Sequence, residues 1–436
     1  MKKVLLLLFL LLALLVFYVT RPVYQFYAHR GAVPFLTGGT LTIPELSPKA
    51  SEVYRDLYKE AGKQAVEAMA LHQWKINTPG LTAAVGVDGD LVWAGAVGWA
   101  DIEEQRPMTV NSQLRIGSTS KALTSTLLAR MLQDGKVELD AKVGELALGE
   151  LNPNWRDITP RQLASHMAGL PHYKENTERL GLYQSIALNR HYSDVNDAVT
   201  LFDQSDMLFS PGEDFSYSSF GTVLLSAVLQ ERGGQRFQAL MTQYVFAPLN
   251  MQQTLTSERH SETSDASEIV DFYWRQDETK REVREWRKVD LSHRLAGGGF
   301  VSTSSDLVRL GLGFVDSNFI APGIREQFWT PQRLNNGEEN EQGYAIGWRV
   351  YEQDFGEPFG KLTVAHHGGV SRGAQSWLMV IVEKGMVIAV NMNAKTERFA
   401  DFAQVAKPIA QAFLHQFETA DEKVDNSISL ITTPDK

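Results

Sequence analysis

Strand-forming sequence lies near both ends of the chain, and helix-forming sequence lies between them. The four predicted strands are residues 81–87, 91–97, 376–382 and 386–391. Each pair flanks a short turn, at residues 88–90 and at residues 383–385. The segment of about 118–250 is mostly helical, with breaks at Gly and Pro. This order predicts an α/β (α+β) fold. One antiparallel sheet is built from both chain ends with flanking helices, a mostly helical subdomain is inserted, and the cleft between the two is a natural place for a site.

Other segments complete this outline. Residues 47–74 and 398–417 place apolar residues at helical spacing, the first after the start signal Ser47-Pro48. Residues 259–290 are highly charged, and they contain a predicted hairpin. The strands of this hairpin are residues 269–274 and 282–286. We interpret it as a solvated ribbon, with a rim that contacts substrate as the alternative.

Composition narrows the classes of function. The chain has 436 residues and a net charge of −10, and no basic patch dominates, so no nucleic-acid partner is expected. It has no cysteine, which removes disulfides, thiolate zinc sites, a cysteine nucleophile and any lipid attached through cysteine. We predict one large domain over residues 46–418 and a loose polar tail over residues 419–436.

The N-terminus predicts a membrane segment. Two lysines precede an apolar run over residues 4–19, which ends at Arg21. No small-x-small cleavage pattern follows, so we interpret residues 1–20 as an uncleaved anchor with the lysines inside; a cleaved signal segment is the alternative. Residues 21–45, with three prolines and a Gly-Gly pair, are predicted to be a linker or an extended arm. The expected location is the inner membrane with the main domain in the periplasm, or the periplasm alone if the segment is cleaved.

Ser118 and Lys121 form the central chemical feature, because they are the chain's one serine followed by a lysine three residues later. A helix is predicted to begin at Ser118 and end near Gly135, which places both side chains on one face. Ser118 then lies at a helix N-terminus, where free N–H groups favour developing negative charge. A serine alcohol needs a base, and a neutral amine one turn away can serve. Alone, the spacing is more typical of a helix cap with a surface lysine.

Two further motifs stand near predicted secondary structure. Tyr217 and Ser219 precede the apolar helix 220–230, which places a phenol and a hydroxyl on one turn. The segment 365–369, Ala-His-His-Gly-Gly, precedes a predicted strand. A tyrosine at a helix start is usually a packing residue, and a histidine pair is compatible with a metal. No nearby carboxylate or third ligand has suitable spacing, so we predict no metal.

Together, in this order and at this spread, the three motifs resemble those of the penicillin-recognising serine hydrolases, which include class C β-lactamases, D,D-peptidases and esterases. The resemblance covers about residues 78–415. It includes three supporting segments, residues 159–171, 296–303 and 343–348. In several details the chain looks most like the mitochondrial serine β-lactamase-like proteins and their bacterial relatives. The resemblance implies a β-lactamase/transpeptidase-like fold and a hydrolase that needs no metal or organic cofactor.

The resemblance also implies roles for individual residues. Ser118 would be the acylated nucleophile, and Lys121 and Tyr217 would share the proton transfers. The backbone N–H groups of Ser118 and Gly369 would form the oxyanion hole. The residues predicted to contact the oxyanion or the substrate are Gly369, Ser219, His366, Gly368 and Arg372.

Two of these residues depart from the pattern of the family's β-lactamases. Ser219 stands where asparagine is common, and His366 stands where a lysine meets the β-lactam carboxylate. Arg372 is interpreted either as a new carboxylate anchor or as a solvent-facing side chain. His166 is predicted to be structural.

The predicted function is therefore hydrolysis of an ester or an amide bond through an acyl-Ser118 intermediate, with a small molecule or a peptide as substrate. A D,D-peptidase or a weak β-lactamase acting on cell-wall-like substrates is the alternative within the class. A catalytically quiet, membrane-tethered binding or assembly module is the alternative of another class. His172 and Tyr173 either border the cleft or pack away from it.

Overall fold

An eight-stranded antiparallel sheet organises the computed structural model, which describes residues 2–34, 39–146, 152–256 and 268–417. The strand order is β10-β11-β12-β13-β3-β4-β2, and β5 pairs with β4. The strands are β2 (Lys49–Val53), β3 (Gly80–Val87), β4 (Asp90–Asp101), β5 (Arg106–Pro107), β10 (Arg349–Asp354), β11 (Lys361–Ser371), β12 (Ala374–Ile381) and β13 (Met386–Met392). Because β13 pairs with β3, the two chain ends meet in the middle of the sheet, as predicted.

Both faces of this sheet are covered by helices. On β12, Trp377, Met379 and Ile381 belong to the core under α2 (Lys59–Lys75), α11 (Phe399–Ala403) and the helix at residues 406–417. Leu378 and Val380 belong to the core on the other side, which α9 (Ser304–Val315) shares. This alternation with a period of two is that of a strand buried on both faces. The apolar runs at both chain ends are thereby explained.

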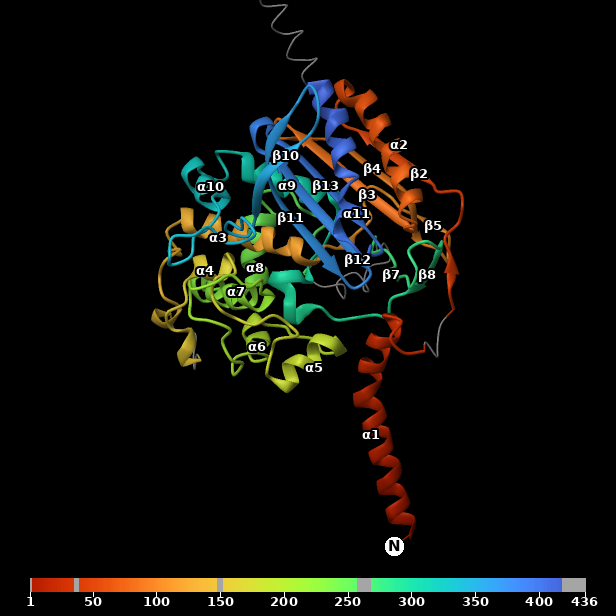
Figure 1. The fold of residues 1–436 in the computed structure, drawn as a ribbon, viewed down its shortest axis with the longest axis vertical. Coiled ribbons are helices and arrows are strands. Elements are labelled where there is room, and N and C mark those ends of the chain that lie inside the picture. The colour runs from red at the N-terminus through yellow and green to blue at the C-terminus, as the bar shows by residue number, and fades with distance from the viewer. Residues whose placement is uncertain (1, 35–38, 147–151, 257–267, 418–436) are drawn as a thin grey trace, which may run out of the picture.

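The inserted segment forms a helical subdomain beside the sheet, with α3 (Ser120–Gln133) on the side that faces the sheet (Figure 1). The other helices of this segment are α4 (Pro160–Ala164), α5 (Arg179–Ala187), α6 (Val195–Val199), α7 (Ser219–Gly233) and α8 (Phe237–Met241). Helix α10 (Pro322–Trp329), from later in the chain, packs against α3. Nearly every side chain of α3 is buried, because it packs against both the subdomain and the sheet side of the core. It is thus a fixed support at the boundary of the two layers.

The region before α2 differs from the prediction. The single helix predicted over residues 47–74 is wrong at its start, because β2 (Lys49–Val53) and a turn precede α2. Ala50 and Ser51 lie opposite Ala96 and Gly95 of β4, which offers an unpaired sheet edge. Pairing with that edge satisfies backbone groups that a helix would otherwise satisfy locally.

The N-terminal helix is longer than predicted. Helix α1 (Lys2–His29) runs through Pro22, so the predicted linker over residues 21–45 is wrong for its first nine residues. Phe26 and His29 are buried, and the His29 ring lies 4.7 Å from that of Trp286. These contacts with the body offset the hydrogen bond that a proline removes from a helix. Among the described residues, α1 is the one helix that is long and apolar enough to cross a membrane, with a mean hydropathy of 2.7.

Several smaller elements complete the fold. They are β1 (Leu41–Thr42), β6 (Leu114–Arg115), β7 (Tyr273–Trp274), β8 (Glu282–Glu285) and β9 (Val301–Ser302). The predicted hairpin within 259–290 is confirmed in shorter form, as β7 paired with β8. The first part of that charged stretch, residues 259–267, and the tail from residue 418 lie outside the described residues.

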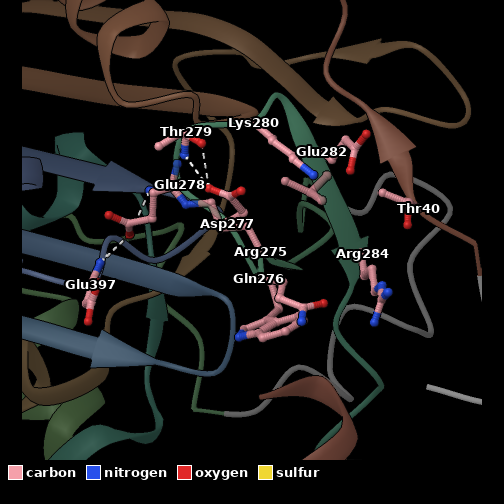
Figure 2. A pocket seen from close by; sticks show the side chains of 12 residues that line it. Thr40, Arg275, Gln276, Asp277, Glu278, Thr279, Lys280, Glu282, Arg284 and Glu397 are labelled. Carbon is pink, nitrogen blue, oxygen red and sulfur yellow. Dashed lines mark hydrogen bonds and ion pairs between the residues drawn. The ribbon is translucent and has the colours of Figure 1, made fainter. Parts of the chain in front are cut away.

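A polar cavity of about 740 Å³ lies at this hairpin. Figure 2 shows Glu278 pointing toward Glu397, whose backbone N–H it accepts, and Arg275 completes the group by pairing with Glu278 at 3.5 Å. None of the residues of the three sequence motifs lines this cavity. The three motifs lie elsewhere, near the junction of α3 and β11.

Candidate active site

Ser118 sits in a 3-10 turn, η2 (Gly117–Thr119), that leads from β6 into α3. Gly117 adopts a φ of +51°, which favours glycine, and a Cβ there would lie 2.6 Å from the carbonyl oxygen of Val370. The missing side chain lets β11 approach the turn closely. Ser118 remains partly exposed, although the residues on either side of it are buried. The sequence therefore folds here so that one hydroxyl is presented at the start of a buried helix.

Lys121 lies one turn later and is fully enclosed. Its Nζ donates to Gly297 O at 2.7 Å and to Ser219 Oγ at 2.9 Å, and it lies 3.4 Å from Ser118 Oγ. Among the described residues, no carboxylate pairs with it. Burial lowers the pKa of Lys121 to about 7, and the positive charges of Arg349 and Arg294 act in the same direction. A large share of Lys121 is therefore neutral near pH 7, and a neutral amine can accept a proton from Ser118.

Tyr217 approaches the same hydroxyl from the loop before α7. Burial raises the pKa of Tyr217, and its hydrogen bond with Ser118 partly opposes that rise. The Lys121 Nζ lies 4.8 Å from the centre of the Tyr217 ring. Ser118, Lys121 and Tyr217, which are far apart in the sequence, are thus brought together as the motifs predict.

His166 and His172 hold this loop in place. The backbone N–H of Ser218 donates to His166 Nδ1 at 3.3 Å, and that of Ser219 donates to His172 Nδ1 at 3.2 Å. The His166 ring lies 4.2 Å from the ring of Tyr217. Burial lowers the pKa of both histidines, that of His172 to about 3, so both are neutral hydrogen-bond acceptors. These contacts suit the structural role predicted for His166, and they place His172 at the base of the tyrosine loop.

The free edge of β11 forms the other wall of the site. Strand β10 pairs with β11 only up to His366, so the edge of residues 367–371 is left for η2 and for a ligand. Gly369 makes the approach possible, because a Cβ there would lie 1.9 Å from Ile116 O. Thr119 Oγ1 also lies 3.3 Å from His367 O, its acceptor. Gly369 thus packs closely against the turn that carries Ser118.

His366 does not reach the site, so its predicted role in contacting substrate is wrong. Its ring stacks on Trp377 at 4.3 Å, on the face of the sheet that α11 covers. Side chains alternate along a strand, so the next residue, His367, points to the face shared with α3. His367 Nε2 lies 2.8 Å from Tyr344 Oη, and Nδ1 lies 2.8 Å from Gly368 O. Burial lowers the pKa of His367 well below its usual value, so it brings no charge to the cleft.

The remaining predicted substrate residues are distributed as follows. Ser219 is buried and accepts from Lys121 Nζ at 2.9 Å, so it supports the lysine. Gly368 faces away, because a Cβ there would lie 2.7 Å from the ring of Phe399. Arg372 is at the turn after β11, and its guanidinium points to α5, where Nη2 lies 3.3 Å from Ser185 O.

Two arginines near the site, Arg349 and Arg294, went unassigned in the sequence. The guanidinium of Arg349 lies 5.3 Å from the centre of the Tyr217 ring and 4.9 Å from that of Tyr344. Arg294 lies 4.1 Å over the Tyr173 ring. Arg349 directly follows the segment 343–348 that carried the resemblance, and Arg294 lies two residues before another such segment. Proximity to these segments was the available signal.

The arrangement is suited to acyl transfer by a serine. It combines a partly exposed hydroxyl at a helix start, a buried amine of lowered pKa and a phenol within reach of both. Among the residues that the structure describes, no three potential ligands from His, Cys, Asp and Glu gather at one place. The absence of a metal or cofactor stays a prediction.

Comparison with known proteins places this arrangement in a family. The Beta-lactamase family model matches residues 63–409. The chain is 27% identical to the serine beta-lactamase-like protein LACTB, mitochondrial, of Mus musculus over 83% of this chain and 82% of that protein. It is also 27% identical to penicillin-binding protein 4* of Bacillus subtilis, over 66% of this chain and 62% of that one.

Solved structures agree on the fold. D-amino acid amidase from Ochrobactrum anthropi superposes with a TM-score of 0.65 at 19% identity, over 83% of this chain and 99% of that chain. The family model covers most of the chain and includes all three motifs. The chain belongs to the beta-lactamase family of serine hydrolases.

Proposed function

We propose that the chain hydrolyses an ester or amide bond through an acyl-Ser118 intermediate. Neutral Lys121 takes the proton of Ser118 as Oγ attacks the scissile carbonyl carbon, and Tyr217 delivers a proton to the leaving group. Water then attacks the acyl-enzyme, with the same residues exchanging the proton in reverse. The observation that carries this proposal is the buried lysine, with Nζ 3.4 Å from Ser118 Oγ and a pKa lowered to about 7.

For the oxyanion hole we propose the N–H groups of Ser118 and Val370, in place of Gly369. The turn between β11 and β12 has two residues, with Ser371 opposite Ala374. The closing pair of such a hairpin is hydrogen-bonded, and the direction of N–H groups alternates along the strand. This alternation directs the N–H of Gly369 toward β12 and that of Val370 toward the free edge. The role of Gly369 is then to let the strand approach η2.

Labelling with a fluorophosphonate, followed by intact mass and peptide mapping, tests the mechanism. We expect one adduct on Ser118, and in Ser118→Ala neither adduct nor turnover, with a loss of about 10³-fold or more. Ser193→Ala, which changes an exposed serine, serves as the matched control and should label normally. An adduct at another serine, or normal turnover in Ser118→Ala, overturns the proposal.

We also propose that α1 anchors the chain in the inner membrane with the body in the periplasm. The apolar helix with two lysines before it supports this orientation. Cell fractionation and added protease test it in intact and permeabilised spheroplasts. Recovery of the body in the cytoplasm, or protection from protease in spheroplasts, contradicts this location.

A further inference from the structure

Three arginines, one buried and two partly buried, gather between α5 and the candidate active site. We call Arg287, Arg294 and Arg372 the arginine cluster. Arg294 and Arg372 both donate to one acceptor, Ser185 O, at 3.3 Å each. Arg287 donates to the next two carbonyl groups, at 3.1 Å and 2.6 Å. The end of α5 is therefore capped by three guanidinium groups.

Capping a helix does not account for so much charge. The C-terminus of a helix is equivalent to roughly half a negative charge, and this effect falls off within one turn. In the part of the chain that the structure describes, no carboxylate forms an ion pair with any member of the cluster. Burial lowers the pKa of all three arginines, that of Arg372 to about 9, and neighbouring arginines add to the effect for Arg287 and Arg372. The cluster thus holds an excess of more than two positive charges.

The cluster also borders the nucleophile. A Cβ placed on Gly298 would lie 3.7 Å from the carbonyl carbon of Gly117 and 4.0 Å from Cδ of Arg294. Gly298 therefore separates the side chain of Arg294 from the residue that precedes Ser118, and the charge of Arg294 acts on Lys121. Arg372 follows the free edge of β11 by one residue, and its buried Nε has no partner among the described residues. Because the two guanidinium groups share the acceptor Ser185 O, they lie together on one side of the site.

The other titratable groups near the β11 edge are either neutral or placed away from Arg294 and Arg372. His367 is neutral, and its two ring nitrogens are engaged by Tyr344 and by Gly368 O. Arg349 lies at the opposite end, over the Tyr217 ring. An anionic part of a substrate that lies along the β11 edge therefore meets its strongest attraction at Arg294 and Arg372.

We propose that Arg294 and Arg372 form an anion-binding subsite, so that the substrates are esters or amides that carry a carboxylate or phosphate group a few bonds from the scissile carbonyl. This inference rests on the proposed acyl-Ser118 chemistry and adds the substrate class. A guanidinium binds either anion through paired N–H groups. The buried charge is left uncompensated in the free protein and is neutralised when the substrate enters.

Matched aryl esters test this proposal with the full-length protein in detergent. The neutral ester is 4-nitrophenyl butyrate. One anionic ester, mono-4-nitrophenyl succinate, carries its carboxylate on the acyl group, and the other, 4-acetoxybenzoate, carries it on the leaving group, with phenyl acetate as its neutral reference. We expect kcat/KM to favour at least one anionic ester over its reference. Arg294→Met and Arg372→Met should lower kcat/KM for that ester by about 10- to 100-fold relative to kcat/KM for its neutral reference in the same variant.

A binding measurement separates recognition from a purely structural role. A buried cation without a counter-ion destabilises the fold, so Arg294→Met and Arg372→Met should match or exceed the Tm of the wild type in anion-free buffer. Added glutarate or inorganic phosphate should raise the wild-type Tm and leave those of the two variants unchanged. Arg232→Met is the matched control, because Arg232 also donates to a carbonyl, Lys136 O, but on the exposed surface.

The outcomes separate the two proposals. If neither neutral nor anionic esters are hydrolysed and Ser118 is not labelled, the proposed function fails. If neutral esters are hydrolysed and no anionic ester is preferred, the anion subsite alone is overturned. It is likewise overturned if Arg349→Gln abolishes the preference while Arg294→Met and Arg372→Met keep it, or if those two variants lower the Tm by several degrees and still respond to glutarate.

Discussion

The cleft is bordered by two kinds of buried cation, and they differ in whether the proton can leave. Lys121 is enclosed with two good acceptors, and burial lowers its pKa to about 7, so a large share of it loses its charge by deprotonation near neutral pH. Arg372 is partly buried, and burial lowers its pKa to about 9, which still leaves it charged near neutral pH. Burial therefore makes the lysine a base, and it makes the arginines receptors for an anion.

Replacing the buried lysine by an arginine should have the largest effect on activity. In Lys121→Arg, the guanidinium stays protonated and cannot accept the proton of Ser118. We expect kcat/KM for any ester to fall by about 10³-fold, with labelling by fluorophosphonate slowed in parallel. Lys142→Arg, at an exposed ion pair with Asp157, is the control and should be unaffected. Activity within tenfold of the wild type in Lys121→Arg would show that Lys121 does not act as a neutral base.

Removing the phenol of Tyr217 tests which proton transfer it carries out and which Lys121 carries out. Tyr217→Phe should lower kcat by about 10²-fold for amides and alkyl esters, whose leaving groups need a proton. The loss should be much smaller for 4-nitrophenyl esters, because nitrophenolate leaves without one. Tyr351→Phe, on an exposed position of β10, should change neither. Equal losses on both types of leaving group would assign Tyr217 to positioning of Ser118 instead.

The pH profile of kcat/KM shows whether Arg294 acts electrostatically on Lys121. Protonated Lys121 is inactive, so kcat/KM should fall about tenfold per pH unit below a midpoint near 7 and level off above it. The charge of Arg294 lowers the pKa of Lys121, so Arg294→Gln should move the midpoint to higher pH, by less than about one unit. Arg232→Gln should leave it in place. A shift to lower pH in Arg294→Gln would contradict the electrostatic coupling.

The smallest expected effect comes from the helix beneath the cluster. The centre of the Phe26 ring of α1 lies 4.9 Å from the guanidinium carbon of Arg372. A chain that begins at residue 39 loses this contact and that of His29, whereas one that begins at residue 21 retains both. We expect both to hydrolyse neutral esters, with the shorter one lower in Tm by a few degrees and in kcat/KM for the anionic ester by about twofold. Identical values for the two would show that α1 only anchors the chain.

Much of this could be predicted from the sequence, because the relevant signals are local. The strands around residues 88–90 and 383–385 are short, largely apolar runs on either side of a turn, and Ser118 and Lys121 are one helical turn apart. The errors lie where contacts between residues far apart in the sequence determine the secondary structure. Nothing local shows that residues 49–53 pair with β4, or that α1 continues past Pro22 because Phe26 and His29 pack on the body.

Within the site, the error at His366 has the same origin. Two adjacent histidines in a strand point to opposite faces, and the sequence alone does not say which face meets α3. The pairing of β11 with β12 settles it, because Met379, opposite His366, lies in the core under α2 and α11. Arg294 went unassigned for a related reason, since its importance comes from Ser185 and Arg372, which are distant in the sequence.

The packing of α1 against the body has a consequence for how substrates are encountered. Its 28 residues span about 42 Å at 1.5 Å per residue, whereas the hydrocarbon layer of a bilayer is about 30 Å thick. With α1 in a membrane, only its last two turns stand above the hydrocarbon layer. The buried residues in these turns pack against the body and restrict its movement relative to α1. The cleft is then held at a fixed, small height over the headgroups. Molecules that concentrate at that surface are sampled by diffusion in two dimensions, and soluble ones must arrive from the bulk.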